Sequence, residues 1–493
     1  MRHYTPTLEE FRLKAREGNL VPVYREILGD METPVSAFKK IDTGRHAFLL
    51  ESVEGGEKWG RYSFLGSEPS AVVRVEGTRM TVESDGTRKT HTVRDPIAGI
   101  QSLLEHYRPV DVDGLPRFVG GAVGYIAYDC VRYLESKVKL PAWRAGDLPD
   151  AQFVLAGEML VFDNLTHTIK VVVNADVGRD PEAAYKRATR RIDAIVDRLR
   201  SWTPTHYQPR RAPHKPVYTS NVTRSEFERD VRRAREAILA GEAFQIVLSQ
   251  ELSTTITCDP YDVYRALRRI NPSPYMYFLR FGDDVVAGAS PEVLVRKEDE
   301  IVELRPIAGT RPRGTTPVED LRLEEELRAS DKDCAEHVML VDLGRNDLGR
   351  VSSYGTVTTD DLMVVERYSH VMHLVSGVRG LVRDGISCFD VLRACFPAGT
   401  VSGAPKVRAM QIIRELEARR RNVYAGGVGY FDFSGNMDMC IAIRTIVFRG
   451  NRATIGTGAG IVANSNPRLE YDETRDKAQV LIAAIDAAEA GLE

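Results

Sequence analysis

The fold of this chain is decided by residues 426–458, whose sequence is GGVGYFDFSGNMDMCIAIRTIVFRGNRATIGTG. Three apolar runs, 426–433, 439–448 and 453–458, are separated by the short polar turns 434–436 (SGN) and 449–451 (RGN). Apolar runs joined by tight turns are typical of antiparallel strands. The stretch therefore predicts a three-stranded meander, with residues 439–448 as one continuous strand.

The rest of the chain repeats this pattern with helices between groups of strands. Further strands are expected at 47–53, 119–126, 243–249, 275–280, 285–288, 293–296 and 301–307. This grouping favours an α+β protein with mainly antiparallel sheets in a sandwich-like core and helices packed outside. Residues 201–217 contain four prolines and few apolar residues, which predicts a linker between an N-terminal region, 1–200, and a second domain, 218–493.

The composition excludes several classes of protein. A net charge of -3 gives no reason to expect nucleic acid or an anionic membrane as partner. No apolar run approaches the ~18 residues of a membrane span, and the N-terminus lacks an apolar signal region. The 6 cysteines form no Cys-x-x-Cys pair, so neither a zinc site nor a disulfide framework is indicated. We expect a cytoplasmic protein.

Two acidic pairs at helical spacing stand far apart in the sequence. Asp333 and Glu336 share one face of a predicted helix at 331–343, and the apolar residues of this helix wrap far enough around it to predict packing inside the protein. Glu470 and Glu473 share a face of a second predicted helix. Together the carboxylates would suit a hard cation such as Mg²⁺, and two solvated acidic faces are the alternative.

Other features indicate anion binding or acid–base chemistry. Arg444 is expected on an apolar face of strand 439–448, where its guanidinium needs a carboxylate, either from a ligand or from an internal salt bridge. The loop 399–406 (GTVSGAPK) precedes a predicted helix from Val407 to Arg420, whose free N–H groups would bind an anion or simply be capped. His337 and His373 lie in apolar surroundings, as core residues or as general acid–base groups.

The run 455–460 (IGTGAG) is not followed by a helix, so a dinucleotide-binding loop is rejected, and its backbone is expected to approach a ligand or another strand closely. The residues alone therefore favour a Mg²⁺-dependent enzyme acting on a small carboxylated or phosphorylated substrate. The competing class is a non-catalytic binding module, an amino-acid or anion sensor whose metal only bridges protein and ligand.

Four longer motifs occur in one order along the chain: 305–314 (RPIAGTRPRG), 335–342 (AEHVMLVD), 399–406 (GTVSGAPK) and 472–478 (DETRDKA). In this order they resemble the motifs of the chorismate-utilising enzymes, and nearly the whole chain closely resembles the large subunits of anthranilate synthase within that family. The resemblance implies a lyase that converts chorismate and ammonia to anthranilate and pyruvate in the first committed step of tryptophan biosynthesis.

Site residues follow from the resemblance by position. The implied metal site consists of acidic residues from the two predicted helices: Glu336, Glu473, Glu470 and Asp333. The implied substrate contacts surround the ring and the enolpyruvyl carboxylate of chorismate: Gly309, Thr310, Tyr424, Arg444, Gly458, Gly460 and Lys477. Thr400 would complete the catalytic pocket.

Two residues are implied in proton transfer. Glu292, in the motif 289–292 (ASPE), matches the family's donor to the departing hydroxyl, and a strand-start carboxylate without special duty is the alternative. His373 is the position associated with removal of the ring proton before the ring becomes aromatic.

Two further positions separate this branch from its sister enzymes. Aminodeoxychorismate synthases commonly carry a nucleophilic lysine where this chain has Ala308. Isochorismate and salicylate synthases carry a lysine that activates water where this chain has Gln245, and ammonia needs no such base. Both positions favour anthranilate, with an aminodeoxychorismate or aminodeoxyisochorismate synthase as the alternative.

The resemblance also implies partners and regulation. The chain has no Gly-x-Cys-x-Gly nucleophile elbow, so ammonia is expected from glutamine through a separate amidotransferase subunit, component II, in a hetero-oligomer such as a heterotetramer. Family members are inhibited by tryptophan bound between the sheets, which would couple two distinct sites. The residues that match this regulatory site are Glu51, Ser52, Asn271, Pro272, Ser273, Pro274, Tyr275, Met276 and Tyr430.

Overall fold

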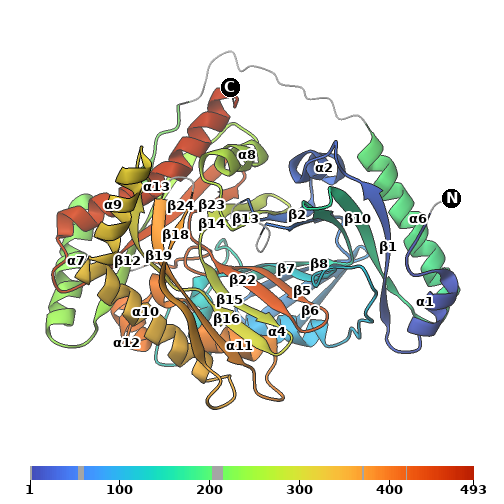
Figure 1. The fold of residues 1–493 in the computed structure, drawn as a ribbon, viewed down its shortest axis with the longest axis horizontal. Coiled ribbons are helices and arrows are strands. Elements are labelled where there is room, and N and C mark those ends of the chain that lie inside the picture. Colours follow the sequence, from blue (N-terminus) through green and yellow to red (C-terminus); the bar gives the residue numbers. More distant parts are fainter. Residues whose placement is uncertain (1–2, 54–59, 202–214, 369–370, 418, 493) are drawn as a thin grey trace.

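Two large sheets form the centre of the computed structural model, which describes residues 3–53, 60–201, 215–368, 371–417 and 419–492 (Figure 1). The first sheet runs, in spatial order, β1 (Leu20–Leu28), β10 (Thr168–Asp176), β9 (Glu158–Asp163), β3 (Tyr62–Ser67), β2 (His46–Glu51), β13 (Tyr275–Phe281), β14 (Asp284–Ser290), β23 (Thr445–Arg449), β24 (Arg452–Ile461), β12 (Gln245–Thr255) and β11 (Thr219–Ser220), with β20 (Gly403–Ala404) also paired to β12. The second runs β17 (Ile307–Pro312), β19 (Val371–Leu381), β16 (Ile301–Leu304), β15 (Val293–Glu298), β22 (Met437–Ile441), β21 (Gly427–Asp432), β7 (Gly121–Ile126), β8 (Ala151–Ala156), β4 (Ala71–Glu76), β5 (Arg79–Ser84) and β6 (Thr87–Thr92), with β18 (Thr358–Arg367) also paired to β19.

Helices cover the outer faces of both sheets, and neighbouring strands in each sheet run antiparallel, so the predicted α+β class is confirmed (Figure 1). Longer helices lie in both halves of the chain: α1 (Leu8–Lys14), α2 (Pro34–Ile41), α4 (Pro96–Leu104), α6 (Pro181–Arg200), α7 (Arg224–Leu239), α8 (Pro260–Ile270), α9 (Pro317–Arg328), α10 (Asp331–Gly349), α11 (Cys388–Cys395), α12 (Lys406–Leu416) and α13 (Pro467–Ala490). The described residues also include three short helical turns: η1 (Tyr128–Cys130), α5 (Val131–Leu134) and η2 (Gly399–Val401).

The central strands, such as β7 and β8, are buried on both faces because each sheet packs against the other and against helices, whereas the edge strand β6 is exposed. On β13, Tyr277 belongs to the apolar layer between the sheets, whereas its neighbour Phe278 packs on the outer side against Tyr264 of α8. Val123 of β7 and Val428 of β21 supply the opposite wall of the inner layer. Alternate side chains therefore serve two apolar layers, which explains why these strands read as nearly continuous apolar runs.

Both regions of the chain contribute to both sheets. Strand β2 of the N-terminal region pairs with β13, and β7 pairs with β21, so each sheet continues from one region into the other. Of the expected linker 201–217, residues 202–214 lie outside the described residues. The division of the chain into domains at this linker stays a prediction.

The predicted strand 439–448 is wrong, because the chain leaves one sheet and enters the other within it. Strand β22 belongs to the second sheet and β23 to the first. Residues 442–444 between them form the first crossing from one sheet to the other. A second crossing joins β14 of the first sheet to β15 of the second through Pro291 and Glu292. The meander expected at 426–458 is thus divided between the two sheets, and each crossing carries one charged residue, Arg444 in the first and Glu292 in the second.

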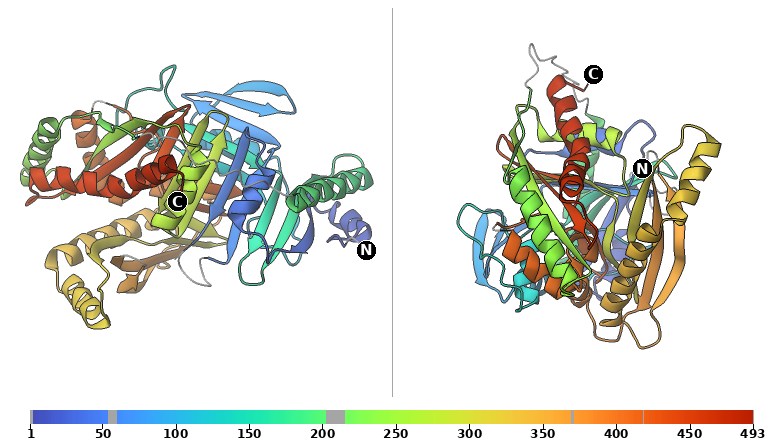
Figure 2. Two further views of the ribbon diagram at one scale, coloured as in Figure 1. Left: turned by 90° about the horizontal axis from the view of Figure 1, so that it is seen from above. Right: turned by 90° about the vertical axis from the view of Figure 1, so that its left-hand side faces the viewer.

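The prediction that the helix at 331–343 packs inside the protein is also wrong in part. Helix α10 extends to Gly349 and buries one face, including Leu340, Val341 and Leu348, but Val338 is 51% exposed. The helix predicted from Val407 to Arg420 begins one residue earlier, at Lys406, and ends at Leu416. Viewed from above, α9 and α10 lie across from α7 and α13 at the same end of the molecule (Figure 2).

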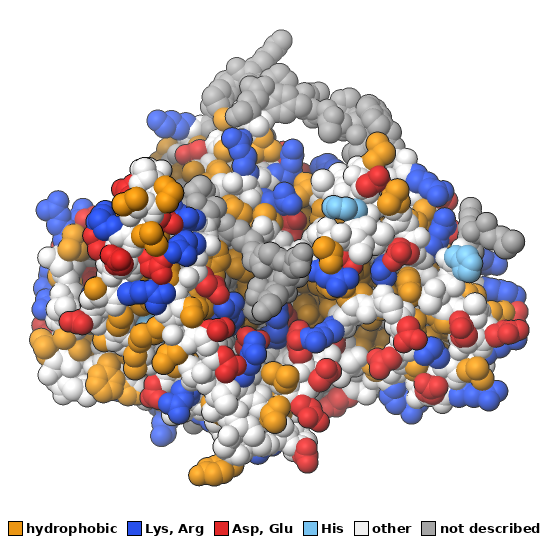
Figure 3. Space-filling view, in the orientation of Figure 1, with side chains coloured by type: hydrophobic (Ala, Val, Ile, Leu, Met, Phe, Trp, Pro, Cys, Tyr) orange, Lys and Arg blue, Asp and Glu red, His pale blue; other side chains and the backbone are white. Residues whose placement is uncertain are grey.

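The distribution of surface charge and the state of the cysteines agree with what the composition predicts. On the face drawn in Figure 3, acidic and basic side chains are interspersed, so this face presents no uniform basic surface. All six cysteines are free thiols, and five of them are buried. In the described ranges, no helix has the length and apolar character needed to cross a membrane.

Candidate active site

The two crossings lie side by side and are joined by hydrogen bonds. The Ile441 N–H donates to the Glu292 carbonyl at 3.0 Å, and the Ala289 N–H donates to the Arg444 carbonyl at 3.1 Å. The Ser290 hydroxyl donates to the Ile441 carbonyl at 2.6 Å. The structure therefore fixes the backbones of Glu292 and Arg444 relative to each other, although 152 residues separate them in the sequence.

Arg444 has a strained backbone. Its φ of 49° lies in the left-handed region, and Ala425, whose N–H donates to the Ala442 carbonyl at 2.9 Å in the same crossing, has a φ of 65°. Such conformations cost about 1–3 kcal/mol each at a residue other than glycine and persist where the surrounding structure enforces them. The strain marks this crossing as a candidate site.

Glu292 is buried, and burial raises the pKa of its carboxyl to about 8. The Thr400 hydroxyl and the Ile307 N–H lie near the carboxyl and partly oppose this rise. The contact with Thr400 is loose, since Thr400 Oγ1 is buried without a hydrogen bond of good geometry to any described residue. At neutral pH Glu292 therefore carries a proton and has the character of a general acid.

His373 of β19 is a neutral imidazole facing the same region. Its Nδ1 lies 2.9 Å from the Gly309 carbonyl oxygen and 3.1 Å from Thr310 Oγ1. Burial lowers the pKa of His373, and the positive charge of Arg444 acts in the same direction. Because the Nδ1–H donates to the Gly309 carbonyl, Nε2 is the atom that can accept a proton.

The glycines of β24 lie close to other side chains of the site. A Cβ at Gly458 would lie 2.6 Å from the Tyr424 hydroxyl oxygen, and a Cβ at Gly460 would lie 2.5 Å from Gln245 Nε2. Lys477 Nζ donates to the Gly458 carbonyl at 3.2 Å. The close approach expected for 455–460 is therefore made by side chains of the site itself. Ala308 of β17 and Gln245 of β12 are both buried, and neither position offers a lysine.

The acidic residues divide between two kinds of partner. Glu336 Oε1 accepts a hydrogen bond from Gln245 Nε2 at 3.0 Å, whereas Asp333 forms an ion pair with Arg311 at 2.9 Å. Glu473 pairs with Lys477 of its own helix at 2.7 Å. Within the described part of the chain, no group of three or more His, Cys, Asp or Glu side chains is arranged to hold a metal ion.

The donor chemistry near the helix starts nevertheless fits a hard cation. Burial raises the pKa of Glu470, and the negative charge of Glu473 raises it further, while Lys332 of α10 acts in the opposite direction. The starts of α10 and α13 are thus close enough to interact electrostatically. Carboxylate oxygens that destabilise one another's charge are suitable ligands for Mg²⁺. The metal assignment stays a prediction.

Comparison with known proteins gives a single family. The sequence model of the chorismate binding enzymes matches residues 46–483. The chain is 47% identical to anthranilate synthase component 1 of Pseudomonas putida over 487 residues, covering 98% of each chain. It is 46% identical to anthranilate synthase component 1 of Acetivibrio thermocellus over 490 residues, covering 98% of this chain and 99% of that one.

The chain belongs to the chorismate binding enzyme family. A crystal structure of anthranilate synthase component I from Streptococcus pneumoniae superimposes with a TM-score of 0.77 at 35% identity, covering 92% of this chain and 99% of that one. The resemblance drawn from the four motifs is confirmed.

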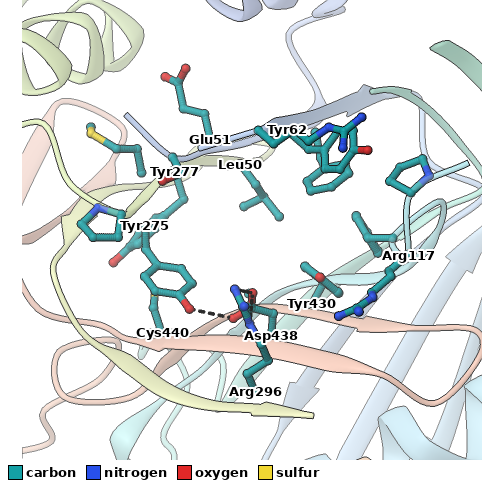
Figure 4. A pocket seen from close by; sticks show the side chains of 18 of the residues that line it. Leu50, Glu51, Tyr62, Arg117, Tyr275, Tyr277, Arg296, Tyr430, Asp438 and Cys440 are labelled. Atoms are coloured by element: carbon teal, nitrogen blue, oxygen red, sulfur yellow. Dashed lines mark hydrogen bonds and ion pairs between the residues drawn. The ribbon is translucent and has the colours of Figure 1, made fainter. Parts of the chain in front are cut away.

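Apart from the candidate active site, this chorismate binding enzyme has a cavity of about 510 Å³ between its sheets (Figure 4). Six of the nine residues predicted for a regulatory site line this cavity: Glu51, Ser52, Pro274, Tyr275, Met276 and Tyr430. Asn271, Pro272 and Ser273 do not line it. The Glu51 carboxylate points away from the cavity (Figure 4) and accepts hydrogen bonds from the Tyr264 hydroxyl and from Arg268 Nε at 2.7 Å.

Sequence reasoning missed the polar centre of this cavity. Asp438 accepts a hydrogen bond from the Tyr275 hydroxyl at 3.0 Å and forms an ion pair with Arg296 at 2.8 Å. Asp438 gave a signal, because it is the one charged side chain in the otherwise apolar strand β22, whereas Arg296 gave none, because it begins the charged end of β15, Arg296-Lys297-Glu298.

His337 lies outside the candidate active site. Its Nε2 is 2.6 Å from Ser376 Oγ, its side chain is fully buried, and burial lowers its pKa to about 4. It is a neutral core histidine that joins α10 to β19.

Proposed function

We propose that this chain is the chorismate-converting large subunit of an anthranilate synthase, a lyase that forms anthranilate and pyruvate from chorismate and ammonia. The observation that carries the proposal is the protonation state of two side chains at the site: Glu292 is protonated and His373 is neutral. In addition, positions 308 and 245 hold alanine and glutamine rather than lysine. An ammonia-dependent route needs one acid and one base but no lysine nucleophile.

Glu336, Glu473 and Glu470 would hold Mg²⁺, with Asp333 nearby. When bound, the ion would neutralise the ring carboxylate of chorismate and withdraw electron density from the ring. The Arg444 guanidinium would bind the enolpyruvyl carboxylate through paired hydrogen bonds, and the buried surroundings of the crossing would strengthen that pairing.

Glu292 and His373 divide the two proton transfers between them. As ammonia bonds to ring carbon 2, the bond from carbon 4 to its hydroxyl breaks, and Glu292 gives its proton to that oxygen, which leaves as water. His373 Nε2 then takes the proton from carbon 2 as the bond to the enolpyruvyl oxygen breaks. The departing enolpyruvyl group gains a proton at its methylene carbon and leaves as pyruvate. The nitrogen releases the surplus proton that it carried from ammonia, and the ring becomes aromatic.

The partner and location are part of the same proposal. Ammonia would come from glutamine through a separate amidotransferase subunit, in a hetero-oligomer. The name component 1, carried by the relatives, supports a second component. Six free thiols support a reducing compartment, the cytoplasm.

The deciding experiment is product identification. The purified chain, mixed with chorismate, Mg²⁺ and ammonium at a pH that supplies free ammonia, is expected to form anthranilate and pyruvate in equal amounts. Formation of aminodeoxychorismate, aminodeoxyisochorismate or isochorismate would assign a sister activity instead. Tryptophan binding without turnover would assign the sensor class.

Substitution of Glu473 tests the metal site. Glu473→Gln is expected to raise the Mg²⁺ concentration for half-maximal rate by about 10- to 100-fold, because an amide oxygen is a weaker ligand than a carboxylate. Glu182→Gln is the matched control, since Glu182 also pairs with a lysine four residues later on an exposed helix face. An equal Mg²⁺ requirement in both variants would remove Glu473 from the site.

Tryptophan is expected to inhibit turnover by binding in the cavity between the sheets. An indole ring and an amino-acid group fit within about 510 Å³, and the wall offers the aromatic ring of Tyr430 together with Arg296 and Asp438. The measurement is initial rate against tryptophan concentration, with direct binding by calorimetry. Unchanged rates at saturating tryptophan would refute regulation through this cavity.

A further inference from the structure

A narrow cavity of about 40 Å³ lies behind Glu292, on the buried face of α10. It is lined by Glu292, Val293, Leu294, Leu304, Arg305, Pro306, Leu340, Leu343, Gly344, Asp347, Cys395, Ala398, Gly399 and Thr400. Leu340 and Asp347 are seven residues apart on one helix, which corresponds to about 10 Å along its axis. The lining of the cavity therefore extends for about 10 Å along α10.

The two ends of the cavity are polar and its middle is apolar. At one end lie the Glu292 carboxyl and Thr400, whose Oγ1 is buried without a hydrogen-bond partner among the described residues. At the other end lies Asp347, which is 4% exposed; its Oδ2 accepts from Lys406 Nζ at 2.6 Å, while its Oδ1 finds no partner in the described ranges. Leu304, Leu340 and Leu343 form the walls between them.

Unpartnered polar atoms at both ends of a cavity are typical of ordered water. A buried water needs roughly 10–15 Å³ and two or more polar partners, so the cavity has room for about three waters in a row. We propose that this cavity holds a file of waters from Asp347 to Glu292 that returns a proton to Glu292 after each turnover, with Asp347 and Lys406 as positioning residues. The inference rests on the proposed function, in which Glu292 is the acid.

The acid must be restored after each turnover, and the proton that it regains matches the surplus proton that the attacking nitrogen releases to solvent. When the substrate's hydroxyl leaves as water, Glu292 becomes a carboxylate and can serve again only after it gains one proton. The adjacent water would give that proton, each water would take one from the next, and the water at Asp347 would take one from solvent. The Asp347 side chain is 6% exposed, so the file ends close to the surface.

Charged and polar groups face both ends of the file. Burial raises the pKa of the Asp347 carboxyl, and the charges of Lys406 and Arg350 oppose only part of that rise. Burial also raises the pKa of the Cys395 thiol, which stays neutral. Arg305 in the wall pairs with Glu366 at 2.5 Å. At the other end, Glu292 faces the Thr400 hydroxyl and the Ile307 N–H. With its Oδ2 held by Lys406, Asp347 is placed to accept a hydrogen bond from water at its Oδ1, and Glu292 lies at the other end of the file.

Gly344→Ala tests the file without removing a charge. The added Cβ would lie 3.4 Å from Leu304 Cδ1 and 3.7 Å from Pro306 Cγ, ordinary contacts with two residues that also line the cavity. Alanine also favours a helix interior over glycine, so the variant is expected to melt no lower than the parent. Gly349→Ala is the matched control, because it makes the same change on the same helix where nothing lies within 4 Å.

We expect Gly344→Ala and Asp347→Asn each to lower kcat by about three- to tenfold, with the KM for chorismate unchanged and a larger solvent isotope effect on kcat, as slowed reprotonation would produce. Asp347→Glu is expected to restore most of the rate. A high-resolution crystal structure of the parent is expected to show ordered waters in the cavity. A dry cavity, or variants that match Gly349→Ala in kcat and isotope effect, would overturn the inference. If the parent makes no anthranilate, the proposed function fails instead, whatever the cavity contains.

Discussion

Glu292→Gln is expected to lower kcat with ammonia by about 10²- to 10⁴-fold, the usual contribution of a positioned general acid. Glutamine has nearly the same size and can still accept the Ile307 N–H, but it has no acidic proton for the departing hydroxyl. The KM for chorismate should change little, because the carboxyl acts on the leaving group rather than on either substrate carboxylate. The measurement is steady-state anthranilate fluorescence with the melting temperature recorded beside it.

Glu158→Gln is the control for this substitution. Glu158 is also a carboxyl whose pKa is raised by burial, but it lies on β9 and pairs with Arg191, remote from the crossings. It is expected to lose stability and keep its rate per folded molecule. If the two variants lost activity in proportion to their loss of stability, Glu292 would be a structural carboxyl only.

The same carboxyl sets the alkaline side of the pH profile. Burial raises the pKa of Glu292 from an ordinary 4.5 to about 8, so the acid form is present below that pH and is lost above it. Rates expressed per unit of free ammonia should therefore be level through neutrality and fall above about pH 8. In Glu292→Gln that fall should disappear. A parent profile that stays level to high pH would contradict the assignment.

The sequence allowed most of the elements to be predicted but not how the sheets exchange strands. Turn chemistry at 434–436 and 449–451 marks the ends of β21, β22, β23 and β24 correctly. The change of sheet at 442–444 leaves no such mark, because Ala442 and Ile443 continue the apolar run without glycine or proline. The left-handed backbone conformation of Arg444 could not be predicted either, because only glycine and a few polar residue types favour a positive φ.

The metal and regulatory residues illustrate the same limit. Helical spacing correctly placed Glu470 beside Glu473, a local relation that one helix enforces. It did not reveal that Asp333 pairs with Arg311 or that Glu336 meets Gln245, because those partners come from other strands. Likewise Glu51 follows Leu50 on β2, but only the packing of α8 decides that its carboxylate points to Arg268 rather than into the cavity.

Arg444→Gly is expected to separate stability from activity at the crossing. At a φ of 49° glycine carries no steric cost, so the variant should melt at or above the parent temperature although it has lost a side chain. Its kcat/KM for chorismate should nevertheless fall by about 30-fold to several thousandfold, since losing a buried charged contact to a carboxylate costs about 2–5 kcal/mol. Arg444→Lys should lie between, because an ammonium keeps the charge but not the planar pair of donors.

Ala425→Gly provides the comparison that makes this result decisive. This substitution relieves the backbone strain of Ala425, whose φ is 65° and whose N–H donates to the Ala442 carbonyl of the same crossing. It leaves the Arg444 guanidinium in place, so the rate should remain near that of the parent. If Arg444→Gly were as active as Ala425→Gly, the strain at Arg444 would serve only the passage between sheets. If Arg444→Gly were stable and inactive while Arg444→Lys recovered part of the rate, the fold would be maintaining a strained backbone in order to aim one cation at the substrate. That second pattern is the one we expect, because backbone strain of this kind persists only where the surrounding structure enforces it, and it clusters at functional sites.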